Sequence, residues 1–342
     1  MPSWCVMISL SNLPNFIQKA PTDGVWELYL DHSILSSARM CEARFWLDYV
    51  EAKESKGMIS WPLAYGSLIH EQMEHYYKAQ MEGKFELRKW LEFSVAKWYE
   101  LRMPAYKDYP QFKSIGGFEG FVTSTTQYAE YYNRSIDNLK PIALEIPFGK
   151  AKEVPLLEDH TLYRYAPFRL YLSGRMDFIF DNGRNIGPLD HKSFSIAGKN
   201  PVLGYEVQEG MTGYVYAMDY IYKNHFAIIP GMFGRSTNIL WLNFMLTKTE
   251  PDLNKKFQRI PLYKTPYQLE AWRMRQISTA AKIYQLLFED RVPDFNAHVC
   301  TNYFHSTCPY QPVHRLGTEQ DMFTILSKDF QVRQNQWNPE AE

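Results

Sequence analysis

The chain has 342 residues, of which 45% are hydrophobic and 16% aromatic, and this composition excludes a disordered protein and provides for an ample core. The formal net charge of −1 excludes a strongly basic surface all round, although acidic metal ligands and a local basic cleft are compatible with it. No apolar run is long enough to span a membrane, and the N-terminus shows no signal-peptide pattern. We therefore expect a cytoplasmic protein without a membrane partner.

Helices dominate the first part of the chain. Residues 1–30 are expected to form an N-terminal extension with some strand character, followed by a helical hairpin over 31–55 and a helix over 64–81. The segment 85–138 is rich in Trp, Tyr and Phe and is interrupted by prolines. Because proline breaks helices, this segment is expected to be a helical insertion of several short helices that covers one side of a cleft.

Strands and helices alternate in the next part of the chain. The apolar pattern predicts three strands, a helix, two more strands and a long helix. This order, with the helix at 64–81, predicts an α/β fold in which helices flank a mixed central sheet. The absence of internal repeats and linkers favours one domain with an insertion. The predicted elements cover 141–148, 167–180, 185–193, 203–222, 237–247, 256–262 and 265–289.

Charged side chains lie on two strands that a tight turn connects. The turn Asp181–Arg184 contains Asn-Gly, the favoured pair for a two-residue hairpin. Pairing of its two ends places Asp177 diagonal to Asp190, and side-chain alternation then brings Asp177, Asp190 and Lys192 to one face. Diagonal neighbours lie roughly 7–8 Å apart, close enough for two carboxylates to share a divalent ion.

The alternative interpretation is an ordinary hairpin with a charged solvent face. The residues beside the three charged positions are mostly apolar, as in Met176, Phe178 and Leu189. Such a strand is expected to be buried, where charges are costly unless they are paired or bound to metal. A metal site is therefore favoured.

Two upstream segments carry further candidates. Tyr65–Glu71 opens a helix in which His70 follows Gly66 by four residues. A lone helical histidine is usually a satisfied core or surface residue, but we expect Gly66 to allow a close approach of the helix to the sheet, which favours a ligand role for His70. Glu145 is the acid of the strand over 141–148, and the alternative there is a strand-edge acid paired with a lysine.

These motifs, in this order, resemble the PD-(D/E)XK, or restriction-endonuclease-like, nuclease superfamily, and specifically its RecB-type branch with the CRISPR-associated exonuclease-like proteins. The resemblance implies a restriction-endonuclease-like αβββαβ core and hydrolysis of phosphodiester bonds. This sequence matches four features of the family: the G-x-x-D segment, the D-x-K pair, the G-x-x-x-H motif and the additional acid. The residues that carry the resemblance are Gly66, His70, Glu145, Asp177, Asp190 and Lys192.

The resemblance also implies roles for these residues. His70, Asp177, Asp190 and the backbone carbonyl of His191 would bind Mg²⁺ or Mn²⁺. Lys192 would position or deprotonate the attacking water and counter the charge that develops on the phosphate. Glu145 would assist the water or a second metal, which places it with Asp177, Asp190 and Lys192 among the catalytic residues. The His191 side chain faces away and is expected to be structural.

The branch carries a Q-x-x-x-Y motif on the helix after the D-x-K strand. Tyr214 fits the tyrosine, but Gly210 stands at the glutamine position and the nearest glutamine is Gln208. Residues i and i+6 do not share a helical face, so the motif is imperfect. We expect Tyr214 to contact DNA. Gln208 either does so from a shifted helix start, or the role of the glutamine is lost. Arg175 either neutralises a phosphate or forms a structural salt bridge.

The chain contains four cysteines, which suggests free thiols or metal ligands rather than a disulfide framework. Cys41, Cys300 and Cys308 resemble the ligands of iron–sulfur members of the branch, where one cysteine precedes the first motif and others follow the last helix. His314 stands near the position of the fourth ligand, so the site would hold a 4Fe–4S cluster or Zn²⁺. The alternative is that these thiols are buried and bind nothing.

We therefore expect a nuclease domain over 31–314, with a cysteine-containing cap at 295–314 and a polar tail at 315–342. The predicted activity is that of a metal-dependent deoxyribonuclease, an exonuclease acting on DNA ends or single strands in repair, recombination or phage replication. A helicase or recombinase partner and a phage or prokaryotic source are implied by the resemblance. The alternative is a catalytically inactive nucleic-acid-binding or scaffold module of a helicase–nuclease or packaging complex, but inactive members usually lose an acid or the lysine.

Overall fold

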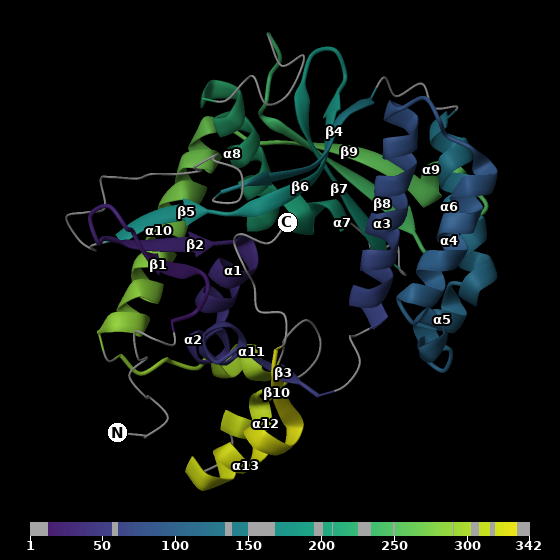
Figure 1. Ribbon diagram of the computed structural model, residues 1–342. Coiled ribbons are helices and arrows are strands. Elements are labelled where there is room, and N and C mark those ends of the chain that lie inside the picture. The colour runs from purple at the N-terminus through teal and green to yellow at the C-terminus, as the bar shows by residue number, and fades with distance from the viewer. Residues whose placement is uncertain are drawn as a thin grey trace. The chain divides into compact units, whose positions relative to one another are not determined.

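The structure is a computed structural model (Figure 1) in which the chain divides into two compact units. Unit 1 comprises Met1–Met58, Pro147–Gly174 and Glu270–Glu342, and unit 2 comprises Ile59–Ile146 and Arg175–Leu269. The predicted catalytic residues belong to unit 2 and the three candidate cysteine ligands to unit 1. The residues that the structure describes are 13–56, 61–133, 139–149, 168–194, 201–206, 208–224, 234–248, 250–289, 291–301, 308–314 and 319–333.

Unit 1 contains a three-stranded sheet in the order β1-β2-β5. Its strands are β1 (Ile17–Lys19), β2 (Trp26–Leu30) and β5 (Phe168–Leu172). β1 pairs antiparallel with β2, and β2 pairs parallel with β5. The N-terminal extension predicted over 1–30 therefore contributes two strands to a sheet.

The helices of unit 1 begin with α1, whose start is set by a cap. The Asp31 carboxylate accepts a hydrogen bond of 2.7 Å from the backbone N–H of Ile34, and this cap satisfies one of the free amides of the first turn. The helical elements of unit 1 are α1 (His32–Met40), α2 (Glu42–Phe45), the π-helix η2 (Trp46–Val50), α10 (Pro266–Phe288, which starts in unit 2), α11 (Ala297–Thr301), α12 (Gln311–His314) and α13 (Glu319–Asp329).

The described part of the segment predicted as a polar tail over 315–342 contains a helix and a strand. Helix α13 leads into β10 (Phe330–Val332), which pairs antiparallel with β3 (Lys53–Ser55). Phe330 is buried with Tyr310 and Val313 in a small core. This pairing joins residues far apart in sequence, such as Gln331 and Glu54, which are 277 positions apart; this is why local patterns did not predict it.

Unit 2 is built on a five-stranded sheet in the order β4-β6-β7-β8-β9. β6 and β7 are antiparallel, β7 and β8 parallel, and β8 and β9 antiparallel, so the prediction of a mixed sheet is confirmed. Its strands are β4 (Lys140–Phe148), β6 (Gly174–Asp181), β7 (Ile186–Phe194), β8 (Ile239–Leu246) and β9 (Phe257–Tyr263).

Helices cover both faces of this sheet. Trp241 and Met245 of β8 belong to the core that includes α3, α4 and α6, whereas Leu240 and Leu242 pack with Met211 of α8, as the alternation of a strand requires. The α/β arrangement with flanking helices is therefore confirmed. The helices of unit 2 are α3 (Trp61–Met81), α4 (Leu87–Glu100), the 3₁₀ helix η3 (Met103–Tyr106), α5 (Pro110–Ser114), α6 (Gly117–Asn133), α7 (Pro201–Glu206), α8 (Glu209–Asn224) and α9 (Leu253–Lys256).

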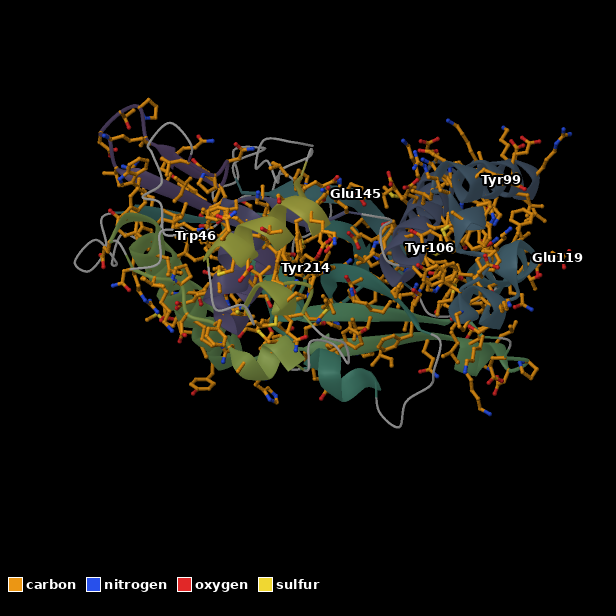
Figure 2. All side chains as sticks on the ribbon, turned by 90° about the horizontal axis from the view of Figure 1, so that it is seen from below. Trp46, Tyr99, Tyr106, Glu119, Glu145 and Tyr214 are labelled. Atoms are coloured by element: carbon orange, nitrogen blue, oxygen red, sulfur yellow. The ribbon has the colours of Figure 1, made fainter. Side chains whose placement is uncertain are left out.

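The helices α4 to α6 occupy the segment that was predicted to be a helical insertion. In Figure 1, α3 lies between the sheet and α4. Tyr106 is buried within this group, whereas Tyr99 is 62% exposed (Figure 2). Most of the aromatic side chains of this segment form core, as expected.

Three predicted elements differ from those observed. The helical hairpin predicted over 31–55 ends in the strand β3. The strand predicted over 167–180 divides into β5 and β6, and a Cβ atom at Gly174 would lie 2.5 Å from Phe148 Cζ, so glycine permits a close approach where the two strands divide. The helix predicted over 203–222 is replaced by α7 and α8. None of the helices described is long and apolar enough to cross a membrane.

Candidate active site

The hairpin between β6 and β7 has a four-residue loop in place of the predicted two-residue turn. Asp181 pairs with Ile186, not with Arg184. Within the loop, Asn182 Oδ1 accepts hydrogen bonds from the backbone N–H groups of Arg184 and Asn185, at 3.0 and 2.8 Å. Asparagine side chains commonly close turns in this way, so the asparagine acts through its side chain rather than through a positive-φ pair.

The corrected register changes the relation between the two aspartates. Phe178 pairs with Leu189, and one further step along the ladder sets Asp177 opposite Asp190 rather than diagonal to it. Residues directly opposite share a face of the sheet and have Cβ atoms roughly 4.5–5.5 Å apart. Lys192 lies on the same face as Asp190 because two residues along a strand complete its repeat.

Ion pairs connect the acids to histidine and lysine. His70 Nδ1 of α3 lies 3.0 Å from Asp177 Oδ2, and Lys192 Nζ lies 2.6 Å from Asp190 Oδ2. The structure therefore brings the helix motif to the first acid and joins the acid and the amine of the D-x-K strand. The close approach attributed to Gly66 is not observed, since a Cβ at Gly66 would meet no described atom within 4 Å.

Glu145 joins this group from the neighbouring strand β4. Its Oε2 lies 2.5 Å from Arg175 Nε of β6, so the structural salt bridge is the observed alternative for Arg175. Burial raises the pKa of Glu145 to about 7, with Arg175 opposing and Asp177 adding to the shift. Glu145 also has a φ of +51°, a left-handed conformation that is unfavourable for a non-glycine residue and often marks functional sites.

The charged groups of this site shift one another's pKa values. Burial raises the pKa of Asp190, Asp177 adds to the shift, and Lys192 opposes it. Burial lowers the pKa of His70, but the hydrogen bond to Asp177 and its charge outweigh burial, so the net direction is upward. Burial likewise lowers the pKa of Lys192 and the Asp190 carboxylate reverses the shift.

The chemistry of these donors fits a divalent cation. Asp190 Oδ2 and Glu145 Oε2 are buried and lack a hydrogen bond of good geometry. The ion pairs with Lys192 and Arg175 are therefore the main interactions that offset the cost of burying these oxygens. Carboxylate oxygens suit Mg²⁺ and the imidazole of His70 suits Mn²⁺. In the ion-paired arrangement, however, no three His, Cys, Asp or Glu side chains of the described ranges are grouped to hold a metal, so cation binding would replace contacts to His70 and Lys192.

The His191 side chain lies in the core, as expected. It is 4% exposed, and its ring stacks on Tyr77 at 5.9 Å and meets Phe178 edge-on at 4.8 Å between centroids. Burial, followed by the charge of His70, lowers its pKa well below the usual value. The ligand role predicted for its backbone carbonyl stays a prediction.

The predicted DNA contacts Gln208 and Tyr214 lie in the helical region that follows β7. Gln208 is exposed before the start of α8, and Tyr214 packs against the core of α8 and β8. Two residues that the sequence did not single out interact with the site. The charges of Tyr205 of α7, Lys192 and Asp190 influence one another, and the charge of Glu74 acts on Glu145. Glu74 could have been found from the sequence, because it follows His70 by four residues and so shares its helical face.

The candidate cysteine ligands lie together in unit 1. Cys41, Cys300 and Cys308 are buried and form no disulfide among the described residues, and burial, followed by the charges of Cys308 and Cys41, raises the pKa of Cys300. The His314 side chain lies outside the described residues. As no metal-binding group of three ligands occurs in the described segments, iron–sulfur and zinc binding stay a prediction without structural support.

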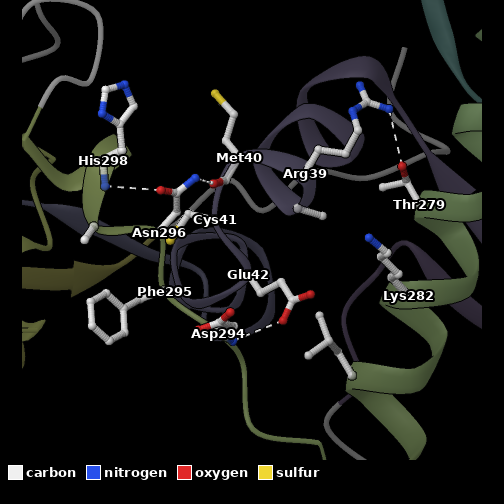
Figure 3. A pocket seen from close by; sticks show the side chains of 13 residues that line it. Arg39, Met40, Cys41, Glu42, Thr279, Lys282, Asp294, Phe295, Asn296 and His298 are labelled. Carbon is white, nitrogen blue, oxygen red and sulfur yellow. Dashed lines mark hydrogen bonds between the residues drawn. The ribbon is translucent and has the colours of Figure 1, made fainter.

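Cys41 also lines a pocket of unit 1 with a volume of 440 Å³. Figure 3 shows Arg39 and Lys282 on one side and Asn296 and His298 on the other. The pocket contains none of the predicted catalytic acids.

Comparison with known proteins supplies an independent test of the family. A search of the curated proteins found no match. The family model described as the PD-(D/E)XK nuclease superfamily matches residues 30–313. The match spans most of the chain, includes His70, Glu145, Asp177, Asp190 and Lys192, and agrees with the mixed sheet and flanking helices. This chain therefore belongs to the PD-(D/E)XK nuclease superfamily.

Proposed function

We propose that this protein is a divalent-metal-dependent deoxyribonuclease of the RecB-type branch that acts as an exonuclease on DNA ends or single strands. Its membership of a nuclease superfamily supports a phosphodiester hydrolase. The observation that carries the proposal is the meeting of His70 with Asp177, 3.0 Å apart, beside the Asp190–Lys192 pair. The two motifs come from segments more than a hundred residues apart and converge where the catalytic residues are expected.

The acids and the histidine are the proposed metal ligands. Asp177, Asp190, His70 and the carbonyl of His191 would hold Mg²⁺ or Mn²⁺. When bound, the ion polarises the scissile phosphate and lowers the pKa of a bound water. The two aspartates come from adjacent strands of one sheet, which is a rigid support for such a site.

Lys192 supplies the fixed positive charge of the proposed reaction. Its ammonium is held 2.6 Å from Asp190 Oδ2, on the face of the sheet that carries the acids. From there it positions the attacking water and stabilises the negative charge that develops on the phosphate. The side chain is 27% exposed, so it can reach a substrate.

Glu145 and Arg175 are proposed to act at the edge of the site. The Arg175 side chain is 53% exposed and is therefore accessible to a DNA phosphate, and Glu145 would then orient water. Tyr214, Gln208 and the electrostatically coupled Tyr205 are proposed contacts to the DNA backbone. A role in repair, recombination or phage replication, with a helicase or recombinase partner in the cytoplasm, extends this proposal by resemblance.

The proposal is tested with linear single- and double-stranded DNA labelled at the 5′ or 3′ end. Wild type should degrade DNA with Mg²⁺ or Mn²⁺ and not with EDTA, and the label released gives the polarity. Asp190→Ala and Lys192→Ala should lose the activity, whereas Asp181→Asn, at the other end of the hairpin, should retain it. Intact DNA under all conditions with binding retained would instead favour the inactive nucleic-acid-binding module.

A further inference from the structure

A buried polar network lies behind the strand that carries Asp190 and Lys192. His191, the residue between them, pairs with Asn243 of β8, and the two side chains are 4% and 1% exposed. Asn243 Nδ2 lies 2.6 Å from His191 Nδ1. The other ring nitrogen, Nε2, has no hydrogen bond within the described part of the chain, so the Asn243 contact is the hydrogen bond that orients this ring.

The same asparagine is held by two tyrosines of α6. Asn243 Nδ2 donates to Tyr128 Oη at 2.5 Å, and Tyr132 Oη donates to Asn243 Oδ1 at 3.1 Å. The amide nitrogen thus faces both Tyr128 and the imidazole, which makes His191 Nδ1 an acceptor. Both tyrosines belong to the segment predicted as a helical insertion. The insertion therefore reaches the catalytic strand through the Asn243 side chain, and also through the Tyr128 ring, whose centroid lies 6.2 Å from that of the His191 ring.

An arginine anchors the far side of the network. Arg259 Nη2 of β9 donates to Tyr77 Oη of α3 at 2.6 Å, and Tyr77 Oη is hydrogen-bonded to Tyr128 Oη. The Arg259 guanidinium also lies 3.6 Å from the centroid of the Tyr132 ring, a favourable cation–π contact. The network therefore joins α3, α6, β7, β8 and β9.

These contacts have a consequence for the acidic site. Fixing the His191 ring on one face of β7 fixes the backbone from which Asp190 and Lys192 project on the other face. Buried and connected polar networks are rigid because each member restrains its neighbours. Partners that orient metal ligands without touching the metal contribute strongly to metal affinity.

We propose that Asn243 is a positioning residue through which the helical insertion holds the Asp190–Lys192 strand in the geometry for cation binding. This inference rests on the proposed function of the same site. Asn243 touches neither substrate nor ion, and its action passes through the His191 ring. The helices α4 to α6 are then a support for the catalytic strand as well as a cover of one face of the sheet.

The test uses a matched pair of substitutions on α6. Tyr132→Phe removes only the hydroxyl that donates to Asn243. Tyr131→Phe makes the same change one residue earlier, where the hydroxyl donates to Asn254 Oδ1 at 2.9 Å, outside the network. Asn243→Leu removes the amide that bonds His191, Tyr128 and Tyr132, and leaves a side chain of similar volume. If Asn243→Leu does not fold, Tyr132→Phe still tests the proposal.

Mn²⁺ affinity is measured by titration without DNA, and the Mg²⁺ dependence of DNA cleavage is measured separately. We expect Asn243→Leu to weaken Mn²⁺ binding roughly tenfold and Tyr132→Phe roughly threefold, with Tyr131→Phe at the wild-type value. A purely structural role would lower the melting temperature and leave Mn²⁺ affinity unchanged well below it.

The outcomes separate the two claims. Wild-type cleavage with unchanged Mn²⁺ affinity in folded Tyr132→Phe and Asn243→Leu would overturn the positioning role and leave the nuclease in place. Weakened Mn²⁺ binding in the variants of a wild type that does not cleave DNA would overturn the nuclease and support the positioning role. A wild type that neither binds Mn²⁺ nor cleaves DNA would overturn both.

Discussion

His70 of α3 and Asp177 of β6 form an ion pair, with 3.0 Å between Nδ1 and Oδ2. The contact joins the helix motif to the first acid of the sheet, although more than a hundred residues separate them. The Asp177 side chain is largely buried, at 16% exposure, and the His70 side chain is partly exposed, at 37%. A histidine held by an acid in this way is oriented toward the site rather than mobile on the helix surface.

Replacing His70 should therefore impair metal binding. We expect His70→Asn to weaken Mn²⁺ affinity and DNA cleavage at limiting Mn²⁺ by at least about tenfold, a typical loss for a residue that holds or orients a metal. His75→Asn is the matched control, because His75 lies on the same helix but stacks on Phe93 at 4.0 Å between centroids. Equal Mn²⁺ affinities for the two variants, by calorimetric titration, would remove His70 from the site.

Divalent cations should stabilise the folded protein. Burial, and to a smaller extent the charge of Asp177, raises the pKa of both Asp190 and Glu145. The neighbouring carboxylates therefore disfavour one another's ionised forms, and a bound cation relieves this. At a Mg²⁺ concentration ten times the Kd, linkage gives about 1.4 kcal/mol of additional stability. We expect a rise in melting temperature that EDTA reverses and that Asp177→Asn reduces; an equal rise in Asp177→Asn would contradict a shared site.

The backbone at Glu145 gives a prediction that separates conformation from charge. At the φ of +51° of this residue, glycine adopts the conformation without strain, whereas alanine lowers the free energy of unfolding by about 1 kcal/mol relative to glycine. Glu145→Gly should therefore unfold at higher urea concentration than Glu145→Ala, while both lose the carboxylate and lower the activity to the same extent. A more stable alanine variant would show that the strand does not hold a left-handed residue there.

Elemental analysis tests the predicted cysteine site. Burial is the main cause of the raised pKa values of Cys300 and Cys308, so as free thiols they should react with iodoacetamide only after unfolding. The predicted cluster instead requires stoichiometric iron or zinc in anaerobically purified protein and its loss in Cys41→Ser. Metal-free protein would make that prediction wrong and leave three buried thiols.

Local patterns were sufficient for much of unit 2. Alternation along β7 placed Asp190 and Lys192 on one face and His191 on the other, because the repeat of a strand does not depend on its surroundings. The order of the helix and strand motifs could also be predicted, because each motif is a short local pattern. The hairpin register was not, because the Asn182 side chain closes a longer loop than its Asn-Gly pair suggests.

Long-range contacts account for what the sequence did not indicate. Asn243 reads as an ordinary polar residue in an apolar strand, and its partners Tyr128 and Tyr132 come from a segment whose aromatic residues all resemble core. The pairing of β10 with β3 likewise depends on two segments that are far apart in sequence and meet in space. Tyr205 has no distinguishing neighbour in sequence, and its relation to Lys192 follows from the placement of α7.

The rate of DNA cleavage by Lys192→Met at saturating Mn²⁺ tests the central claim most directly. This variant keeps the aspartates and removes the ammonium 2.6 Å from Asp190, so Mn²⁺ should still bind, as a parallel titration confirms. The account predicts that wild type degrades end-labelled linear DNA and that Lys192→Met does so at least about a hundredfold more slowly. Cleavage at the wild-type rate by Lys192→Met would contradict the assignment of this site as the catalytic centre.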